Sequence, residues 1–348
     1  MSRRDITARW NDGAMLITRR SRHDRMAASL AARDDDELTA LLRSAPVGAV
    51  GVGGGSTVLH LDGVPVFAKR IPITDRELAR PRSTANLFGL PVSCQYGMYR
   101  LAGPGFGAWR ELAANLMVTE GVLAGEVETF SVLYHWRVLP GRPPAASEHE
   151  DIEAVVEQFG GDPAVRVRLE ELARAVSSLV LFLEYVPDPV SGALTDPVNR
   201  AETIERQLFA AVGFLRSREL LHLDGHFGNM RAGDGRIHLV DFGLATSPRF
   251  ELSDAEREFV AHNAGHDADY AAMRLVNWLV TAVCGVPADS VPVARNAYVR
   301  RCASGGIPKS VPPAVAGVIA RHAPAAARMN DFCWRLFDGD LRAAYPGS

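Results

Sequence analysis

Alternating and apolar stretches near the start of the chain predict a strand-rich region. Residues 47–71 hold an apolar run, a glycine-rich turn, the alternating segment TVLHL and the apolar run VPVFAKRI, which together predict three strands. Asp62 and Gly63, between the last two runs, are a favoured hairpin turn pair. Residues 72–107 are rich in Gly, Pro and Ser and lack clear periodicity, so we expect a long irregular insertion there.

The middle of the chain predicts one long helix together with shorter elements. The long helix is expected over 108–124, where Trp109, Leu112 and Leu116 fall close to one face. The other elements are expected as strands at 130–139 and 179–186 and as short helices near 150–158 and 163–176.

Helical periodicity dominates the second half of the chain. A helix is expected over 199–216, followed by a loop at 222–229 and a short strand at 236–240, and the pattern beyond about residue 251 is mostly helical. Residues 1–45 are expected to be partly helical or loosely ordered, with one helix starting at the acidic run DDD, because carboxylates favour the first turn of a helix.

The composition serves mainly to exclude several classes of protein and of binding site. The 348-residue chain has 47% hydrophobic residues and a net charge of −3, which argues against a nucleic-acid coat. Four scattered cysteines without a CxxC pair argue against a zinc site and a disulfide framework and are typical of a reducing cytoplasm. No apolar run reaches the roughly 20 residues of a membrane helix, and the chain starts without the apolar stretch of a signal peptide. We therefore expect a cytoplasmic protein that binds neither membranes nor nucleic acid.

The cations are almost all arginine, which makes the two lysines informative. Of 38 Lys and Arg residues, 36 are Arg, and the exceptions are Lys69 and Lys309. Lys69 falls on the third expected strand, where it would face a phosphate group, with Phe67 and Ala68 on the other face. Just upstream lies a glycine-rich turn whose backbone amides suit phosphate oxygens. The turn residues expected to bind phosphate are Gly51, Gly53, Gly54, Gly55 and Ser56.

A second cluster of polar residues lies at 221–245, in the segment LHLDGHFGNM…HLVDFGLA. Phosphoryl transfer needs a carboxylate and an amide oxygen for Mg²⁺, and a further carboxylate that accepts the proton of the attacking hydroxyl. Asn229 and Asp241 fit the metal role and Asp224 the proton acceptor, while we expect His222 to brace the loop.

These motifs resemble the protein-kinase-like superfamily, over about residues 47–286. The resemblance implies an α+β, bilobal protein-kinase-like fold with a small β-rich N-terminal lobe carrying one helix and a larger helical C-terminal lobe. It also implies ATP as a substrate and Mg²⁺ as a cofactor. The corresponding division is an N-terminal extension at 1–45, an N-lobe at 46–187 with the insertion at 72–107, and a C-lobe at 188–348.

The resemblance also implies roles for residues outside the two motifs. Lys69 is expected to pair with a glutamate on the helix over 108–124, and Glu111 is preferred to Glu120, which lies near the helix end. Leu183 is expected beside the hinge between the lobes, and the backbone of Glu184 and Val186 is expected to bind adenine.

Three further assignments follow the same resemblance. Ala68 is counted with the ATP-binding residues. Asp269 resembles the aspartate that begins a helix and holds the catalytic loop, with Asp267 as a close second. His226 takes the place of a lysine, as in aminoglycoside-phosphotransferase-type kinases, and would contact the γ-phosphate or the acceptor.

The sequence is compatible with two kinds of phosphate acceptor, a protein or a small molecule. DFGLA, LEYV and VFAK favour a Ser/Thr protein kinase, whereas the loop pattern D-x-H-x-G-N and the missing APE motif favour a small-molecule kinase. We therefore expect transfer of the γ-phosphate of ATP to a hydroxyl of a protein or of a small molecule. A nucleotide-binding pseudokinase is the more distant alternative. The acidic run ELSDAERE after DFG is either a solvated helix face or a rim for a cationic acceptor.

Overall fold

The computed structural model describes residues 3–46, 48, 50–51, 54–97, 101–144, 146–287 and 292–347. It is a mixed α+β structure, about 52% helical, with a small antiparallel sheet. The sheet has the strand order β1-β2-β3-β5-β4, and every neighbouring pair is antiparallel. Its strands are β1 (Val50–Gly51), β2 (Gly54–Leu61), β3 (Val64–Ile73), β4 (Leu133–Pro140) and β5 (Ser177–Glu184).

The predicted hairpin between β2 and β3 is confirmed. Asp62 and Gly63 both have positive φ, 50° and 76°, as a tight two-residue hairpin turn requires. The resulting register places Ser56 opposite Lys69. Gly54 has φ 116°, and a Cβ there would lie 2.2 Å from the carbonyl oxygen of Arg70, so the start of β2 accepts only glycine.

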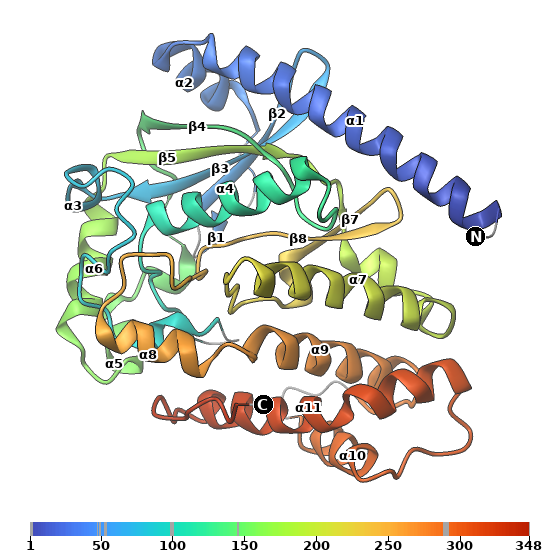
Figure 1. Ribbon diagram of the computed structural model, residues 1–348. Coiled ribbons are helices and arrows are strands. Elements are labelled where there is room, and N and C mark those ends of the chain that lie inside the picture. Colours follow the sequence, from blue (N-terminus) through green and yellow to red (C-terminus); the bar gives the residue numbers. More distant parts are fainter. Residues whose placement is uncertain are drawn as a thin grey trace.

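Helix α4 (Ala108–Ala124) has the bounds that the sequence predicts and lies along one face of the sheet (Figure 1). Its apolar side chains, among them Trp109 and Leu112, pack with Leu181 of β5. Glu77 caps the first turn: its Oε1 accepts from the amide of Ala108 at 2.8 Å, although Gly107 itself offers no side chain. The cap fixes the helix start, and with it the position of the residues in its first turn.

Stacked helices form the other part of the molecule, with α7, α9 and α11 running in successive layers (Figure 1). A three-stranded sheet, β6-β7-β8, lies beside α7. The helices after β5 are α7 (Pro197–Ser217), α8 (Asp254–His262), α9 (His266–Ala282), α10 (Val293–Ala303) and α11 (Pro313–Phe337). The strands are β6 (Asp188–Pro189), β7 (Met230–Gly233) and β8 (Arg236–Leu239), of which the sequence predicts only the last. Two short helices, α5 (Ile152–Gln158) and α6 (Pro163–Arg174), precede β5 as predicted.

The N-terminal segment is more ordered than the sequence suggests. The structure has a 29-residue helix, α1 (Arg3–Ala31), where we allowed loose order. Helix α2 (Asp35–Ser44) starts at the predicted acidic run, with a capping box between Asp34 and Glu37. Tertiary contacts hold α1 in place: Arg19 donates to the carboxylate of Glu184 at 2.5 Å and to the carbonyl of Phe130 at 2.6 Å. Tertiary contacts therefore contribute to the order of this segment, in addition to local helical propensity.

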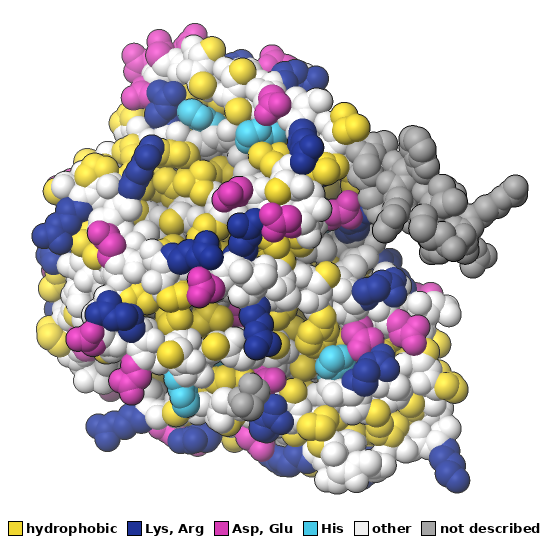
Figure 2. Space-filling view, in the orientation of Figure 1, with side chains coloured by type: hydrophobic (Ala, Val, Ile, Leu, Met, Phe, Trp, Pro, Cys, Tyr) yellow, Lys and Arg dark blue, Asp and Glu magenta, His cyan; other side chains and the backbone are white. Residues whose placement is uncertain are grey.

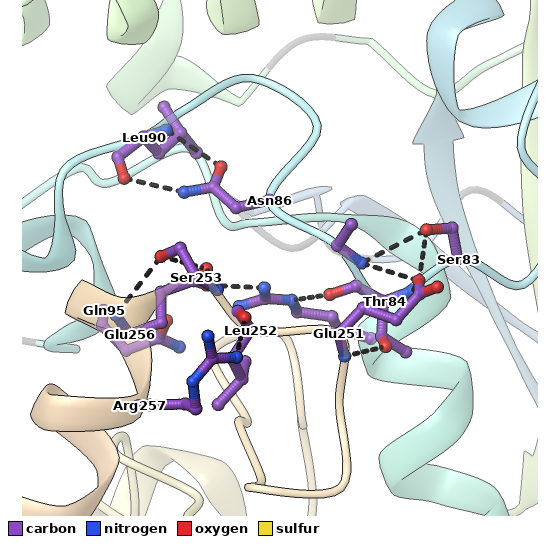
Figure 3. Close-up of polar contacts among 12 residues, drawn as sticks. Ser83, Thr84, Asn86, Leu90, Gln95, Glu251, Leu252, Ser253, Glu256 and Arg257 are labelled. Atoms are coloured by element: carbon purple, nitrogen blue, oxygen red, sulfur yellow. Dashed lines mark hydrogen bonds and ion pairs between the residues drawn. The ribbon is translucent and has the colours of Figure 1, made fainter.

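The insertion predicted over 72–107 begins within β3, which ends at Ile73, and its remaining described residues are irregular apart from α3 (Asp75–Leu78) and a 3₁₀ turn at Val92–Gln95. It runs between α4 and α8, and Figure 3 shows Ser83 and Thr84 turned toward Glu251. Glu251 accepts from the hydroxyl of Ser83 and the amide of Thr84. Beside them, Arg110 of α4 donates to Glu256 of α8 at 2.6 Å and to the carbonyl of Thr84 at 2.6 Å.

The surface carries both signs of charge. On the face drawn in Figure 2, basic and acidic side chains are interspersed and form no continuous basic stripe of the kind that tracks a nucleic-acid backbone. Within the described residues, no helix is both long and apolar enough to cross a membrane.

Candidate active site

The predicted polar residues converge on a cleft of about 1250 Å³ between the five-stranded sheet and the loops that follow α7 and β8. Strand β3 contributes Lys69 and helix α4 contributes Glu111. The remaining predicted residues that line the cleft are Gly54, Gly55, Ser56, Leu183, Glu184, Val186, Asp224, His226, Asn229 and Asp241.

Lys69 is held between two carboxylates. Its Nζ lies 2.6 Å from Oε1 of Glu111 and 2.9 Å from Oδ1 of Asp241, and its side chain is 9% exposed. Burial works against the ammonium charge, but the charges of Asp241 and Glu111 outweigh it, so the pKa of Lys69 is raised. The expected ion pair between Lys69 and Glu111 is therefore present, whereas Glu120 is exposed at the far end of α4.

The pKa values of Glu111 and Asp241 shift in opposite directions, although burial raises and Lys69 lowers both. Burial raises the pKa of Glu111 to about 7, against the effect of Lys69. Burial also disfavours the charge of Asp241, but Lys69 and the amide of Gly243 outweigh it, so the pKa of Asp241 is lowered. Asp241 is thus an anion at neutral pH, and its side chain is 40% exposed toward the cleft.

Asp224 and Asn229 form the second half of the polar site. Asn229 donates from Nδ2 to Oδ2 of Asp224 at 2.8 Å and to the Asp224 carbonyl at 3.0 Å. This geometry fixes the Asp224 carboxylate and leaves the amide oxygen of Asn229 available. Burial and then the charge of Asp241 raise the pKa of Asp224 to about 7, although the hydrogen bond from Asn229 opposes the rise. A carboxyl with this pKa can take up a proton near neutral pH.

The loop that carries Asp224 is braced from behind. The amides of His222 and Leu223 donate to the carboxylate of Asp267 at 2.6 and 3.0 Å, and the His222 ring lies 3.1 Å from the Val240 carbonyl. His222 is buried behind the cleft, as its expected bracing role requires. The preference for Asp269 over Asp267 was wrong, because the Asp269 carboxylate instead accepts from Tyr345 at 2.9 Å.

Backbone strain coincides with the polar site. Leu223 and Asp241 have φ values of 63° and 66°, in the left-handed region that residues other than glycine rarely adopt. Such conformations persist only where surrounding contacts enforce them, and they cluster at functional sites. Here the Asp267 carboxylate holds Leu223, while Lys69 and Gly243 hold Asp241.

One predicted ATP-binding residue, Ala68, does not line the cleft: it is fully buried in the core, on the face opposite Lys69 where we expected it. The expectation that Phe67 shares that face was wrong, because Phe67 lines the cleft. The reason is the two-residue period of a strand, which puts Phe67 on the same face as Lys69. Gly51 pairs with Gly54 in the sheet, and Gly53 lies outside the described residues.

The predicted hinge residues lie at the end of β5 and just beyond it. Leu183, Glu184 and Val186 line the cleft. The carboxylate of Glu184 points to α1, where Arg19 binds it, and its amide donates to the Val132 carbonyl at 2.8 Å, so the backbone carbonyl is the part that can serve a ligand. The carbonyl of Val186 already accepts from Nε of Arg231 at 3.2 Å.

The insertion also reaches the polar site, which sequence reasoning missed. The amide of Gly97 donates to the Leu223 carbonyl at 3.4 Å, and Gln95 donates from Nε2 to the Leu244 carbonyl at 2.6 Å. A Cβ on Gly97 would lie 2.3 Å from the carboxyl carbon of Asp224. No local pattern signals this approach, because it joins segments far apart in the sequence.

We therefore expect Gly97→Ala to push the Asp224 carboxylate out of place while leaving the chain folded. A misplacement of about 1 Å at a reacting group costs about 100-fold in rate. Steady-state kinetics combined with a thermal melt would check this, with Gly213→Ala as control because a Cβ at Gly213 of α7 meets nothing within 4 Å. Equal activity of the two variants would contradict the close contact.

Few of the described side chains in the cleft offer oxygen ligands for a metal ion. Among the described residues, no group of three or more His, Cys, Asp and Glu is placed to hold a metal ion by itself. The oxygens available are those of Asp241 and the amide oxygen of Asn229, which suit a hard cation that shares its shell with a ligand. Comparison of the sequence with protein-family models gives no match, and comparison with curated proteins gives none either.

Proposed function

We propose that the protein is an ATP-dependent phosphotransferase with a bilobal, protein-kinase-like layout. The observation that carries the proposal is the polar assembly in one cleft: Lys69 bound to Glu111 and Asp241, opposite Asp224 bound to Asn229. In this reading the five-stranded sheet with α4 is the small lobe and the stacked helices are the large lobe. The cleft between them would take ATP.

ATP would lie under the start of β2. The adenine would contact Phe67, Leu183 and the backbone of Glu184, all of which line the cleft. The phosphates would lie against Gly54, Gly55 and Ser56, where glycine lets backbone amides approach closely. Lys69, kept charged by its two carboxylates, would bind the phosphate oxygens.

Asn229 and Asp241 fit a Mg²⁺ ion. Nδ2 of Asn229 is committed to Asp224, so its Oδ1 is the free ligand, and Asp241 is an anion at neutral pH. Mg²⁺ in such sites is commonly held by one or two protein groups plus phosphate oxygens, which suits this small donor set. When bound, the ion would neutralise charge that develops on the transferred phosphoryl group.

Asp224 would orient the acceptor hydroxyl. The bond between the γ-phosphorus of ATP and the bridging oxygen breaks, ADP leaves with that oxygen, and the acceptor oxygen forms the new bond to phosphorus. The hydroxyl proton passes to the carboxylate of Asp224 and from there to water. Lys69 and the Asn229 amide hold their groups in place throughout, so the catalytic effect is mainly positioning and charge neutralisation.

A small molecule is the better candidate acceptor because the insertion covers part of the approach to Asp224. Gly97 contacts the loop that carries Asp224, and Gln95 binds the backbone just after Gly243. Glu251 is engaged by Ser83 and Thr84. An extended peptide needs open backbone along such a surface, whereas a compact acceptor needs only the cleft itself.

Nucleotide binding and phosphate transfer together test the proposal. We expect Mg²⁺-dependent binding of ATP, and transfer from γ-labelled ATP to one member of a panel of hydroxyl compounds or proteins. Asp224→Asn should bind ATP but transfer about 10²- to 10⁴-fold more slowly. A chain that binds no nucleotide, with or without Mg²⁺, would refute the assignment, and nucleotide binding without any turnover would favour the pseudokinase alternative.

The raised pKa of Asp224 predicts a pH dependence. Below about 7 the carboxyl is protonated and cannot accept a proton, so kcat/KM should rise with pH through about 7. Glu111, whose pKa is also raised to about 7, acts in the same direction because protonation removes a partner of Lys69. The charge of Asp241 helps raise the pKa of Asp224, and bound Mg²⁺ would offset that charge. The pH midpoint of kcat, which reports the bound enzyme, should therefore lie below that of kcat/KM, which reports the free enzyme. A pH profile that is flat or falls across this range would contradict the role of Asp224.

A further inference from the structure

Arg274 of α9 lies at the acceptor side of the cleft and forms no ion pair with a carboxylate of the described residues. It lines the cleft together with Asp224 and His226, and its guanidinium carbon lies 5.3 Å from the centre of the Phe227 ring. Its Nε is buried and has no hydrogen-bond acceptor in the described part of the chain. Stacking holds a guanidinium plane in position and leaves its N–H edge free for a ligand.

The lack of an ion pair at Arg274 contrasts with three buried arginines, although two of these, Arg19 and Arg168, also have an Nε without an acceptor among the described residues. Arg19, Arg110 and Arg168 each bind a glutamate carboxylate. For Arg274 no ion pair occurs among the residues that the structure describes. A buried donor without an acceptor costs free energy, so its retention favours a role with a bound partner.

A second cation lies on a neighbouring helix. Arg295 of α10, which packs against α9, also has a buried Nε without an acceptor among the described residues. Burial and then the charge of Arg274 lower the pKa of Arg295. Two cations on packed helices favour an anion nearby.

We propose that the acceptor is a small hydroxyl compound with an anionic group, a phosphate or a carboxylate, which Arg274 binds beside the hydroxyl that Asp224 orients. The inference rests on the proposed phosphotransferase function and names the chemical class of its acceptor. Arg274 offers a fork of N–H donors that matches either anion. It also offsets the repulsion that such an acceptor meets from Asp224 and Asp241. The acidic run after DFG is the less suitable feature for binding an acceptor: none of its acidic residues is among the described residues that line the cleft, and Glu251 and Glu256 are bound by the insertion and by Arg110.

Titration of inorganic phosphate into the protein saturated with Mg²⁺-ADP tests the anion site without a known acceptor. We expect Arg274→Gln to bind phosphate about 10-fold to 100-fold more weakly than the unmodified chain, since a charged hydrogen-bond donor is lost. Arg301→Gln is the matched control, because Arg301 is an exposed arginine on the same helix as Arg295 and lies over Tyr298 instead. Equal phosphate affinity in Arg274→Gln and the control would overturn the inference.

Transfer assays then distinguish the two anions and separate this inference from the proposed function. The panel is glycerol, glycerol 3-phosphate, glycerate, an amino sugar and an acidic serine peptide, each with labelled ATP. Labelling of either anionic small molecule, reduced in Arg274→Gln but not in Arg301→Gln, supports the inference and identifies the group. Labelling confined to the neutral compound, the amino sugar or the peptide overturns it and leaves the phosphotransferase intact. Failure to bind Mg²⁺-ADP at the outset would defeat the proposed function itself.

Discussion

Asp241→Asn is expected to slow phosphoryl transfer severely, with a loss in kcat of about 10³-fold or more. Asp241 has two tasks in the proposed site: its carboxylate is one of the two metal ligands and is also a partner of Lys69 at 2.9 Å. Asparagine keeps the shape of the side chain but removes the charge, so neither task is fulfilled. The fold should survive, because Lys69 keeps its 2.6 Å contact with Glu111.

Single-turnover measurement with labelled ATP checks this expectation, with nucleotide affinity measured in parallel. Asp241→Asn should lose both Mg²⁺-dependent ATP binding and turnover, whereas Asp224→Asn should lose turnover and keep most of its affinity. Asp254→Asn is the control with the same chemical change, because the Asp254 side chain is 99% exposed on α8. Undiminished turnover in Asp241→Asn would remove the basis of the assignment.

Arg110→Met is expected to cost about 3–5 kcal/mol in the free energy of unfolding. The side chains of Arg110 and Glu256 are 2% and 4% exposed, so the substitution leaves a buried carboxylate without its cation. Glu256 keeps its contacts to Ser253 at the start of α8, but those contacts were already made in the unmodified chain. Urea unfolding followed by circular dichroism would measure the loss.

Two comparisons separate charge burial from lost packing. Adding Glu256→Gln to Arg110→Met should restore part of the stability, because the buried charge is then gone. Arg300→Met breaks a pair in which both side chains are about half exposed, and should leave the unfolding midpoint unchanged. If Arg110→Met unfolds at the same denaturant concentration as Arg300→Met, the buried pair does not stabilise the fold as argued.

Local physics explains which parts of the fold were predictable. The bounds of α4 follow from an apolar stripe that ends at Gly125, and the start of α2 follows from a capping box, so neighbouring residues carry the information. Strand β7 was missed because Met230–Gly233 is short and has no alternation, and it forms only between β6 and β8 of the folded chain. The order of α1 likewise depends on partners remote in the sequence.

The candidate site likewise contains residues that sequence motifs predict and residues that only the folded chain brings together. Lys69, Asp224 and Asp241 were found because chemistry requires those residue types at motif spacing. The pairing of Lys69 with a helix glutamate followed from the resemblance to the protein-kinase-like superfamily, and helix position favoured Glu111 over Glu120. Strict use of the two-residue period of a strand would have predicted Phe67, and not Ala68, as a residue that lines the cleft beside Lys69. Gly97 and Arg274 carry no motif, and only the assembled chain brings them to Asp224.

The pair between Arg110 and Glu256 has a consequence for how the molecule opens. It joins α4 to α8 across 146 residues of sequence, and the insertion is tied to both by Thr84. Elements that share buried contacts unfold as one cooperative unit. Amide protons in α4 and α8 should therefore exchange with a common opening free energy, although one helix packs on the sheet and the other in the helical layers. One cooperative unfolding unit would then contain α4, α8 and the insertion, although these segments are far apart in the sequence.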